Sequence, residues 1–120
     1  MSRLFLLFSA IFSFAFLGIS TAQATMIEGA QYDASSQSLY LQLVYNGGEK
    51  THQFSLMWDS CQTIDGTQQI AARLIDSGGD DTGTQEIRQI ATFDLSGLQC
   101  KPAWLTIRSD RSSHQTLWIQ

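Results

Sequence analysis

Histidine is the side chain best suited to proton transfer near neutral pH, and the chain has two, His52 and His114. Either is a candidate general base, and with Asp59 or Asp81 as a further ligand the two are candidate zinc ligands. Their spacing matches none of the usual zinc motifs, such as His-Glu-x-x-His. Both stand at the starts of expected strands, where histidines often hydrogen-bond a turn. We therefore predict structural roles for both, no metal site and no cofactor.

A second candidate site is the acidic, glycine-rich segment 76–83, which contains Asp76, Asp80 and Asp81. Carboxylates and backbone carbonyls on a flexible loop are the ligands that calcium prefers. The order of residues differs from that of the helix–loop–helix calcium sites, because glycines interrupt it. Residues 77–83 of this segment are also a candidate inhibitory loop, since a long acidic loop can enter the cleft of a basic hydrolase.

The chain shows no activated nucleophile. It has no Gly-x-Ser-x-Gly or Ser-x-x-Lys motif, and its glycine pairs lack the flanking residues of phosphate-binding loops. The sequence therefore predicts no catalytic residues and a protein that is not an enzyme.

Two tryptophans are expected on the polar face of a C-terminal hairpin. The alternation of residues 103–108 and 114–120 puts aliphatic residues on one face and Trp104, Arg108 and Trp118 on the other. An exposed aromatic pair with an arginine suits a sugar ring, a peptide or a protein partner. The alternative is that the indoles only shield a cross-strand pair.

The elements that position these residues are expected to be strands, because apolar residues alternate with a period of two. Residues 37–59 show the clearest hairpin, with the turn at 46–48. A first strand is expected at 26–32, and strands at 69–76 and 86–93 flank the acidic segment.

With the C-terminal hairpin, the pattern comes to about seven short strands separated by turn residues, and it has no sustained helical period. It predicts an all-β fold, namely an antiparallel β-sandwich or small barrel.

Cys61 follows one expected strand and Cys100 precedes another. Two cysteines are typical of a disulfide in a chain with an N-terminal signal peptide, which residues 1–24 resemble, and they permit one pairing. Closing a loop of about 40 residues stabilises a small domain by roughly 4 kcal/mol in the chain-entropy model.

The N-terminus resembles a secretory signal peptide. Arg3 is followed by an apolar run, Leu4–Leu17, and by a small-x-small pattern that ends at Ala24. The run is about 14 residues, shorter than the roughly 20 that span a bilayer. We predict a signal peptide at 1–24, a single mature domain at 25–120, and release to the periplasm or the medium. No cysteine lies in 18–24, so no lipid attachment and no stable membrane anchor are expected.

The chain is mildly acidic, with 7 Lys and Arg against 11 Asp and Glu and a formal net charge of −4. Its basic residues are scattered along the sequence and form no run that would neutralise phosphates. We therefore expect no nucleic-acid partner.

The stretch 45–58, with Gly47-Gly48 followed by His-x-Phe-x-Leu, resembles a pattern in a group of small exported bacterial β-domain proteins. Segments 74–76, 79–81 and 92–98 are similar to the same group. The resemblance covers about half of the predicted mature domain. It implies a β fold and an exported location, and it implies no activity.

The chain departs from that pattern at two positions. In the group a cysteine often follows the Gly-Gly pair and another follows the acidic loop, whereas this chain has Glu49 and Gly83 there. The departure implies that both cysteines of a second disulfide are absent from this chain.

Together these observations predict an exported β-domain that works as a non-catalytic binding or accessory module with a protein or glycan partner. The first alternative is an inhibitor of a secreted hydrolase, such as a protease or lysozyme. The second is a small metal-dependent enzyme, which requires His52 and His114 to converge in space.

Overall fold

The structure, a computed structural model, describes residues 25–110 and 113–120. This part of the chain contains eight strands and no helix. The predicted signal peptide lies outside the described residues. The strands are β1 (Met26–Asp33), β2 (Ser38–Gly47), β3 (Phe54–Trp58), β4 (Gln62–Ile64), β5 (Thr67–Asp76), β6 (Gln85–Asp94), β7 (Ala103–Arg108) and β8 (His114–Ile119).

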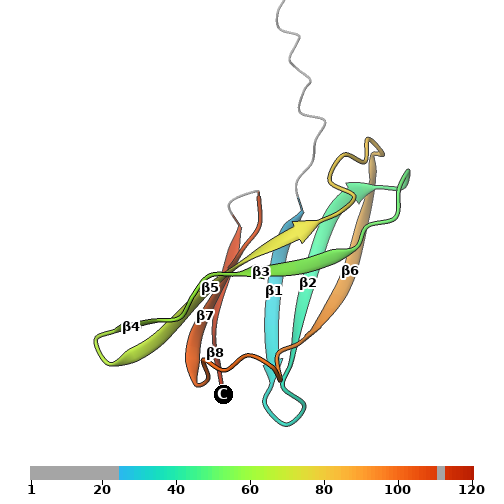
Figure 1. Cartoon of the computed structure of the whole chain (residues 1–120). Helices are drawn as coiled ribbons and strands as arrows, with labels where there is room; N and C mark the ends of the chain where they lie inside the picture. The colour runs from blue at the N-terminus through green and yellow to red at the C-terminus, as the bar shows by residue number, and fades with distance from the viewer. Residues whose placement is uncertain (1–24, 111–112) are drawn as a thin grey trace, which may run out of the picture.

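The strands form two sheets that pack against each other as a β-sandwich. One sheet has the order β1-β2-β6, and the other has the order β3-β5-β7-β8 with β4 paired to β5. Figure 1 shows β3 crossing in front of the first sheet and the β4–β5 hairpin projecting beyond it. The predicted all-β sandwich is confirmed, and the alternative of a closed barrel is not.

The core lies between the sheets and follows the alternation in the sequence. Leu39, Leu41 and Leu43 of β2 and Leu105 and Ile107 of β7 are at most 1% exposed. Burying such a side chain contributes about 1.5–3 kcal/mol. The residues between them point outward, so the period of two correctly separates the core face from the solvent face.

The predicted hairpin at 37–59 is wrong, although both of its strands exist. β2 pairs with β1 and β6, whereas β3 pairs with β5 in the other sheet. The strands expected at 69–76 and 86–93 exist as β5 and β6, but they lie in different sheets and do not form a hairpin around the acidic segment. Alternation shows that a segment is a strand with one buried face, but it carries no information about which strand lies beside it.

Two further features were not predicted. β5 and β7 pair in parallel, in register from Gln69 opposite Trp104 to Arg73 opposite Arg108. β4 is a three-residue strand whose residues are all exposed, so it has no alternation to reveal it. It forms a hairpin with β5 through Asp65 and Gly66, which both have positive φ.

Cys61 and Cys100 form the predicted disulfide, with their Cα atoms 6.2 Å apart. The bridge joins the segment before β4 to the segment before β7. The two sheets also meet where β1 lies beside β8. There the Tyr32 hydroxyl donates a hydrogen bond to the Gln120 carbonyl at 2.8 Å.

Candidate functional site

The outward side of β5, β7 and β8 carries the residues predicted to bind a partner. Strand register arranges them in three rows, because register partners point to the same side of a sheet. We call this surface the outer face. Its rows are Arg73, Arg108 and His114; Ala71, Thr106 and Thr116; and Gln69, Trp104 and Trp118.

Trp104 and Trp118 are direct register partners on the outer face. Their ring centroids are 5.2 Å apart, and their planes meet at 65° in an edge-to-face contact. The side chains of Trp104 and Trp118 are 43% and 40% exposed. Leu105, the next residue after Trp104 on β7, points to the opposite side of the sheet and is fully buried. The structure therefore brings the two predicted tryptophans together at the surface, where they stabilise each other by about 0.5–1.5 kcal/mol.

Arg108 shares this face with the tryptophans but lies at its other end. It lies four positions after Trp104 along β7, a distance of about 13 Å at the usual rise of a strand. Between them, the hydroxyls of Thr106 and Thr116 are 3.0 Å apart and hydrogen-bonded. The register partners of Arg108 are Arg73 on β5 and His114 on β8, and all three residues are exposed.

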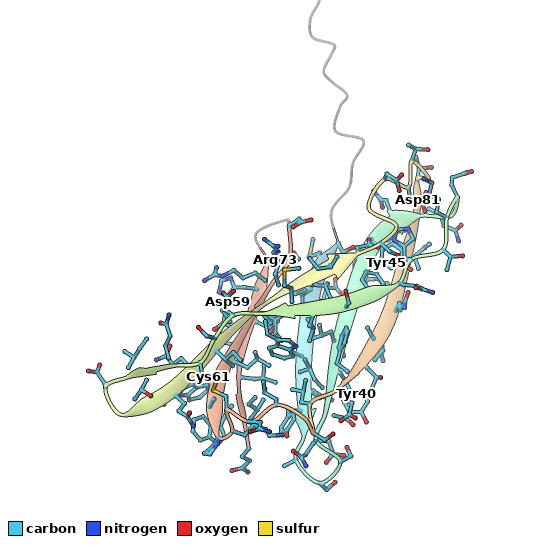
Figure 2. The ribbon with its side chains drawn as sticks, viewed as in Figure 1. Tyr40, Tyr45, Asp59, Cys61, Arg73 and Asp81 are labelled. Carbon is cyan, nitrogen blue, oxygen red and sulfur yellow. A yellow bond between two sulfur atoms is a disulfide. The ribbon has the colours of Figure 1, made fainter. Side chains whose placement is uncertain are left out.

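Two open hollows lie over Ala71, where the small side chain lowers the surface. One holds about 270 Å³ and is lined in part by Met57, Asp59, Arg73 and Arg108. The other holds about 210 Å³ and extends toward the β4–β5 hairpin. Figure 2 shows Asp59 and Arg73 on the same side of the molecule. The outer face thus combines aromatic, hydroxyl and guanidinium groups around a shallow depression.

Trp118 also lines a groove above the seam between the two sheets. The other aromatic walls of this groove are Tyr32 of β1 and Tyr40 of β2. Sequence reasoning missed this groove, because no pattern in the sequence shows that β1 lies beside β8. An aromatic strip therefore continues from Trp104 across Trp118 toward the first sheet.

The two histidines do not converge. His52 lies in the segment before β3 with a side chain that is 3% exposed, and its two ring nitrogens contact different carboxylates. Nδ1 lies 2.9 Å from both oxygens of Asp76, and Nε2 lies 2.8 Å from Asp81. Tyr45 stacks on the imidazole with ring centroids 4.3 Å apart. His114 is exposed on β8.

This arrangement selects the charged form of His52, because a neutral imidazole has only one N–H to donate. Burial by itself lowers the pKa of His52, but the hydrogen bonds to Asp81 and Asp76 and the charges of these carboxylates raise the pKa above its ordinary value. No ring nitrogen remains free for a substrate or a metal ion. In the described residues, no group of three or more histidine, cysteine or acidic side chains is arranged to hold a metal.

Asp81 is buried, and its carboxylate is almost saturated with donors. It accepts hydrogen bonds from the backbone N–H groups of Glu49, Lys50 and Gly83 in addition to His52. Burial alone would raise its pKa, but these donors hold the pKa of Asp81 well below its ordinary value. The cluster ties the β2–β3 connection to the β5–β6 connection, the two crossovers between sheets that meet at this end of the molecule (Figures 1 and 2).

Sequence reasoning named His52, Asp76 and Asp81 but missed that they meet. A signal was present in the repeated Asp-x-Gly: Asp76 and Asp81 each accept a hydrogen bond of 2.8 Å from the N–H two residues later, on Gly78 and Gly83. Both glycines are required, since a Cβ on Gly78 would lie 2.8 Å from the His52 ring and one on Gly83 would lie 2.2 Å from a backbone oxygen.

The acidic segment is therefore pinned at both of its ends. Asp76 also accepts a hydrogen bond from the Thr25 hydroxyl, and the exposed Asp80 pairs with Lys50 at 2.7 Å. These internal bonds use the carboxylates that were expected to bind calcium or to enter a hydrolase cleft. The geometry lends no support to either hypothesis, and both stay predictions.

No described helix is long and apolar enough to cross a membrane. Comparison with family models, with curated proteins and with solved structures found no match. The assignment of a function therefore rests on the site itself.

Proposed function

We propose that this chain is an exported, non-catalytic binding domain and that the outer face, centred on Trp104 and Trp118, is its binding surface. The observation that carries the proposal is the exposed tryptophan pair on strands whose opposite side forms the core. Large aromatic side chains in contact with water lose little conformational freedom when a partner covers them, so they are favoured at binding sites.

The remainder of the structure supports a rigid scaffold for this surface. The disulfide and the His52 cluster fix the connections between the sheets, and the core lies directly beneath the tryptophans. Binding residues on strands are held more precisely than residues on loops. The signal-peptide pattern at 1–24 and the disulfide support export, where disulfides persist.

Capture experiments test the proposal. The purified, oxidised chain is immobilised and exposed to periplasm, culture medium and cell-surface polysaccharide, and the retained material is compared between variants. We expect a retained partner whose capture is lost in the Trp104→Ala/Trp118→Ala double variant.

Ile90→Ala is the matched control, because Ile90 is a 64% exposed apolar residue on the other sheet. It should retain the partner at the level of the unmodified chain. A partner that is still retained by the double tryptophan variant, or whose retention depends on Ile90, would show that the binding surface is not the outer face.

A further inference from the structure

We propose that the ligand of the outer face is a carboxylate-bearing polysaccharide, bound by Arg73 and Arg108 at one end and by the tryptophan pair at the other. This inference rests on the proposed function and adds the chemical class of the ligand.

Arg73 and Arg108 form an unusual pair. They are register partners on adjacent parallel strands, about 4.8 Å apart at the usual strand spacing, and both point outward. Like charges directly opposite each other destabilise a sheet. Among residues 25–110 and 113–120, neither guanidinium has a carboxylate within the 4.0 Å of an ion pair; Arg73 donates only to the sulfur of Met57. An anionic ligand would relieve the repulsion between them.

The other described cations are already engaged. Lys50 pairs with Asp80, and Arg88 pairs with Glu28 at 2.6 Å and with Glu86 at 3.4 Å. Lys101 donates to the Leu95 carbonyl at 2.6 Å and to the Gln37 side chain. In the part of the chain that the structure describes, Arg73 and Arg108 are therefore the two arginines without a carboxylate partner, and both lie on the outer face of a chain with net charge −4. The acidic remainder of the surface would repel an anionic polymer and orient it toward this face.

Carboxylate is the anion that the geometry favours. The planar guanidinium fork matches a carboxylate through two parallel N–H···O bonds, and two adjacent forks can bind one carboxylate or successive ones along a polymer. Asp59 lines the same hollow and is suited to accept hydrogen bonds from hydroxyls. A ligand that carries both carboxylates and hydroxyls satisfies both kinds of group.

A polysaccharide fits the shape of the face better than a peptide does. The arginine row and the tryptophan row are about 13 Å apart, and the threonine hydroxyls lie between them. This spacing suits an extended chain of a few sugar units, whose C–H faces pack on indoles and whose hydroxyls bond to Thr106, Thr116 and Gln69. A peptide that adds a strand would hydrogen-bond to the backbone of an edge strand, whereas the groups of the outer face are side chains that stand on the surface of the sheet.

The test is a binding titration with sodium polygalacturonate, a polymer of uronic acid, and with its methyl-esterified form. The ester keeps the sugar chain and removes the charge. We expect the chain to bind polygalacturonate at least about tenfold more tightly than the ester, with an affinity that falls as salt screens the exposed charges.

Arg73→Gln/Arg108→Gln should lose about tenfold or more of this affinity. Arg88→Gln is the matched control, because it removes one exposed arginine that already has carboxylate partners. Equal affinity for acid and ester, or binding that survives loss of both Arg73 and Arg108, would overturn the inference. An equal affinity for DNA or for polyglutamate would overturn the assignment to a polysaccharide.

The two proposals fail in different ways. If capture of a partner depends on Trp104 and Trp118 while polygalacturonate does not bind, the ligand class is wrong and the binding surface stands. If polygalacturonate binds through Arg73 and Arg108 with an affinity that is unchanged by the loss of both tryptophans, the arginines are the carboxylate site and the proposed centre of the binding surface is wrong.

Discussion

Replacing His52 by glutamine should destabilise the fold by about 3 kcal/mol at mildly acidic pH. The imidazolium makes two charge-assisted hydrogen bonds, to Asp76 and Asp81, and stacks on Tyr45. Such bonds contribute about 1.5–3 kcal/mol each and the stacking about 0.5–1.5 kcal/mol, from which the cost of burying the charge is subtracted. Glutamine keeps a donor but loses the charge, so the two carboxylates remain without a cation.

The loss should depend on pH in a defined direction. The folded-state pKa of His52 lies above that of the unfolded chain, so its contribution is complete below about pH 6.5 and fades as pH rises through the folded-state pKa. The folded-state pKa of Asp81 lies below that of the unfolded chain, so its contribution is complete above about pH 4 and is lost on further acidification. The difference between the unmodified chain and His52→Gln should therefore be largest between about pH 4 and pH 6.5 and should shrink at alkaline pH.

Urea unfolding followed by tryptophan fluorescence, at steps between about pH 4.5 and pH 8.5, measures this difference. His114→Gln controls for the loss of an imidazole at an exposed position. A difference that stays constant across this range, or that grows at alkaline pH, would refute the assignment of a charged His52 to the cluster.

Three further predictions concern the scaffold and the surface. Reducing the Cys61–Cys100 bridge, which spans a sequence separation of 39, should lower the free energy of unfolding by about 4 kcal/mol in urea titrations, and an unchanged midpoint would contradict it. A double-mutant cycle on Trp104→Ala and Trp118→Ala should give a coupling free energy between the two indoles of about 0.5–1.5 kcal/mol. Each single substitution should lower the free energy of unfolding by less than the roughly 2–5 kcal/mol of a truncation in the core, and a loss of that size would show that the pair has a structural role. Gly83→Ala should cost about 1–3 kcal/mol by calorimetry, because its Cβ meets a backbone oxygen, and a neutral effect would show that the loop can shift.

Much of the fold follows from local alternation. Leu39, Leu41 and Leu43 are buried because a strand turns every second side chain to the same side, and the same rule places Trp104 and Trp118 outside. The rule fails at β4, where all three residues are exposed and no periodicity exists.

The sequence could not predict which strands pair with each other. The Gly47-Gly48 pair suggested a tight hairpin, yet the chain crosses there to the other sheet, and the choice depends on contacts made by residues far away in sequence. The parallel pairing of β5 and β7 was missed for the same reason. This pairing places Arg73 beside Arg108, so the sequence pointed to Arg108 as a candidate but not to Arg73.

The His52 cluster illustrates the same limit at the level of single residues. His52 and Asp81 are 29 positions apart, and a pattern search weighs them as separate candidates for catalysis or metal binding. Their contact converts both into parts of the scaffold, because it buries the imidazole and uses both of its ring nitrogens. The outer face remains as the candidate binding site, because its tryptophans are exposed and its two arginines have no carboxylate partner among the described residues.

The most direct test of the binding surface uses the indole N–H signals in a nitrogen-15 NMR spectrum of the chain, recorded with and without the captured ligand. Trp58 serves as an internal control, because it packs against the core from the inner side of β3. The proposed surface predicts that the signals of Trp104 and Trp118 shift on binding while that of Trp58 stays in place. A shift of Trp58 alone, or bound ligand with no shift at Trp104 and Trp118, would contradict it.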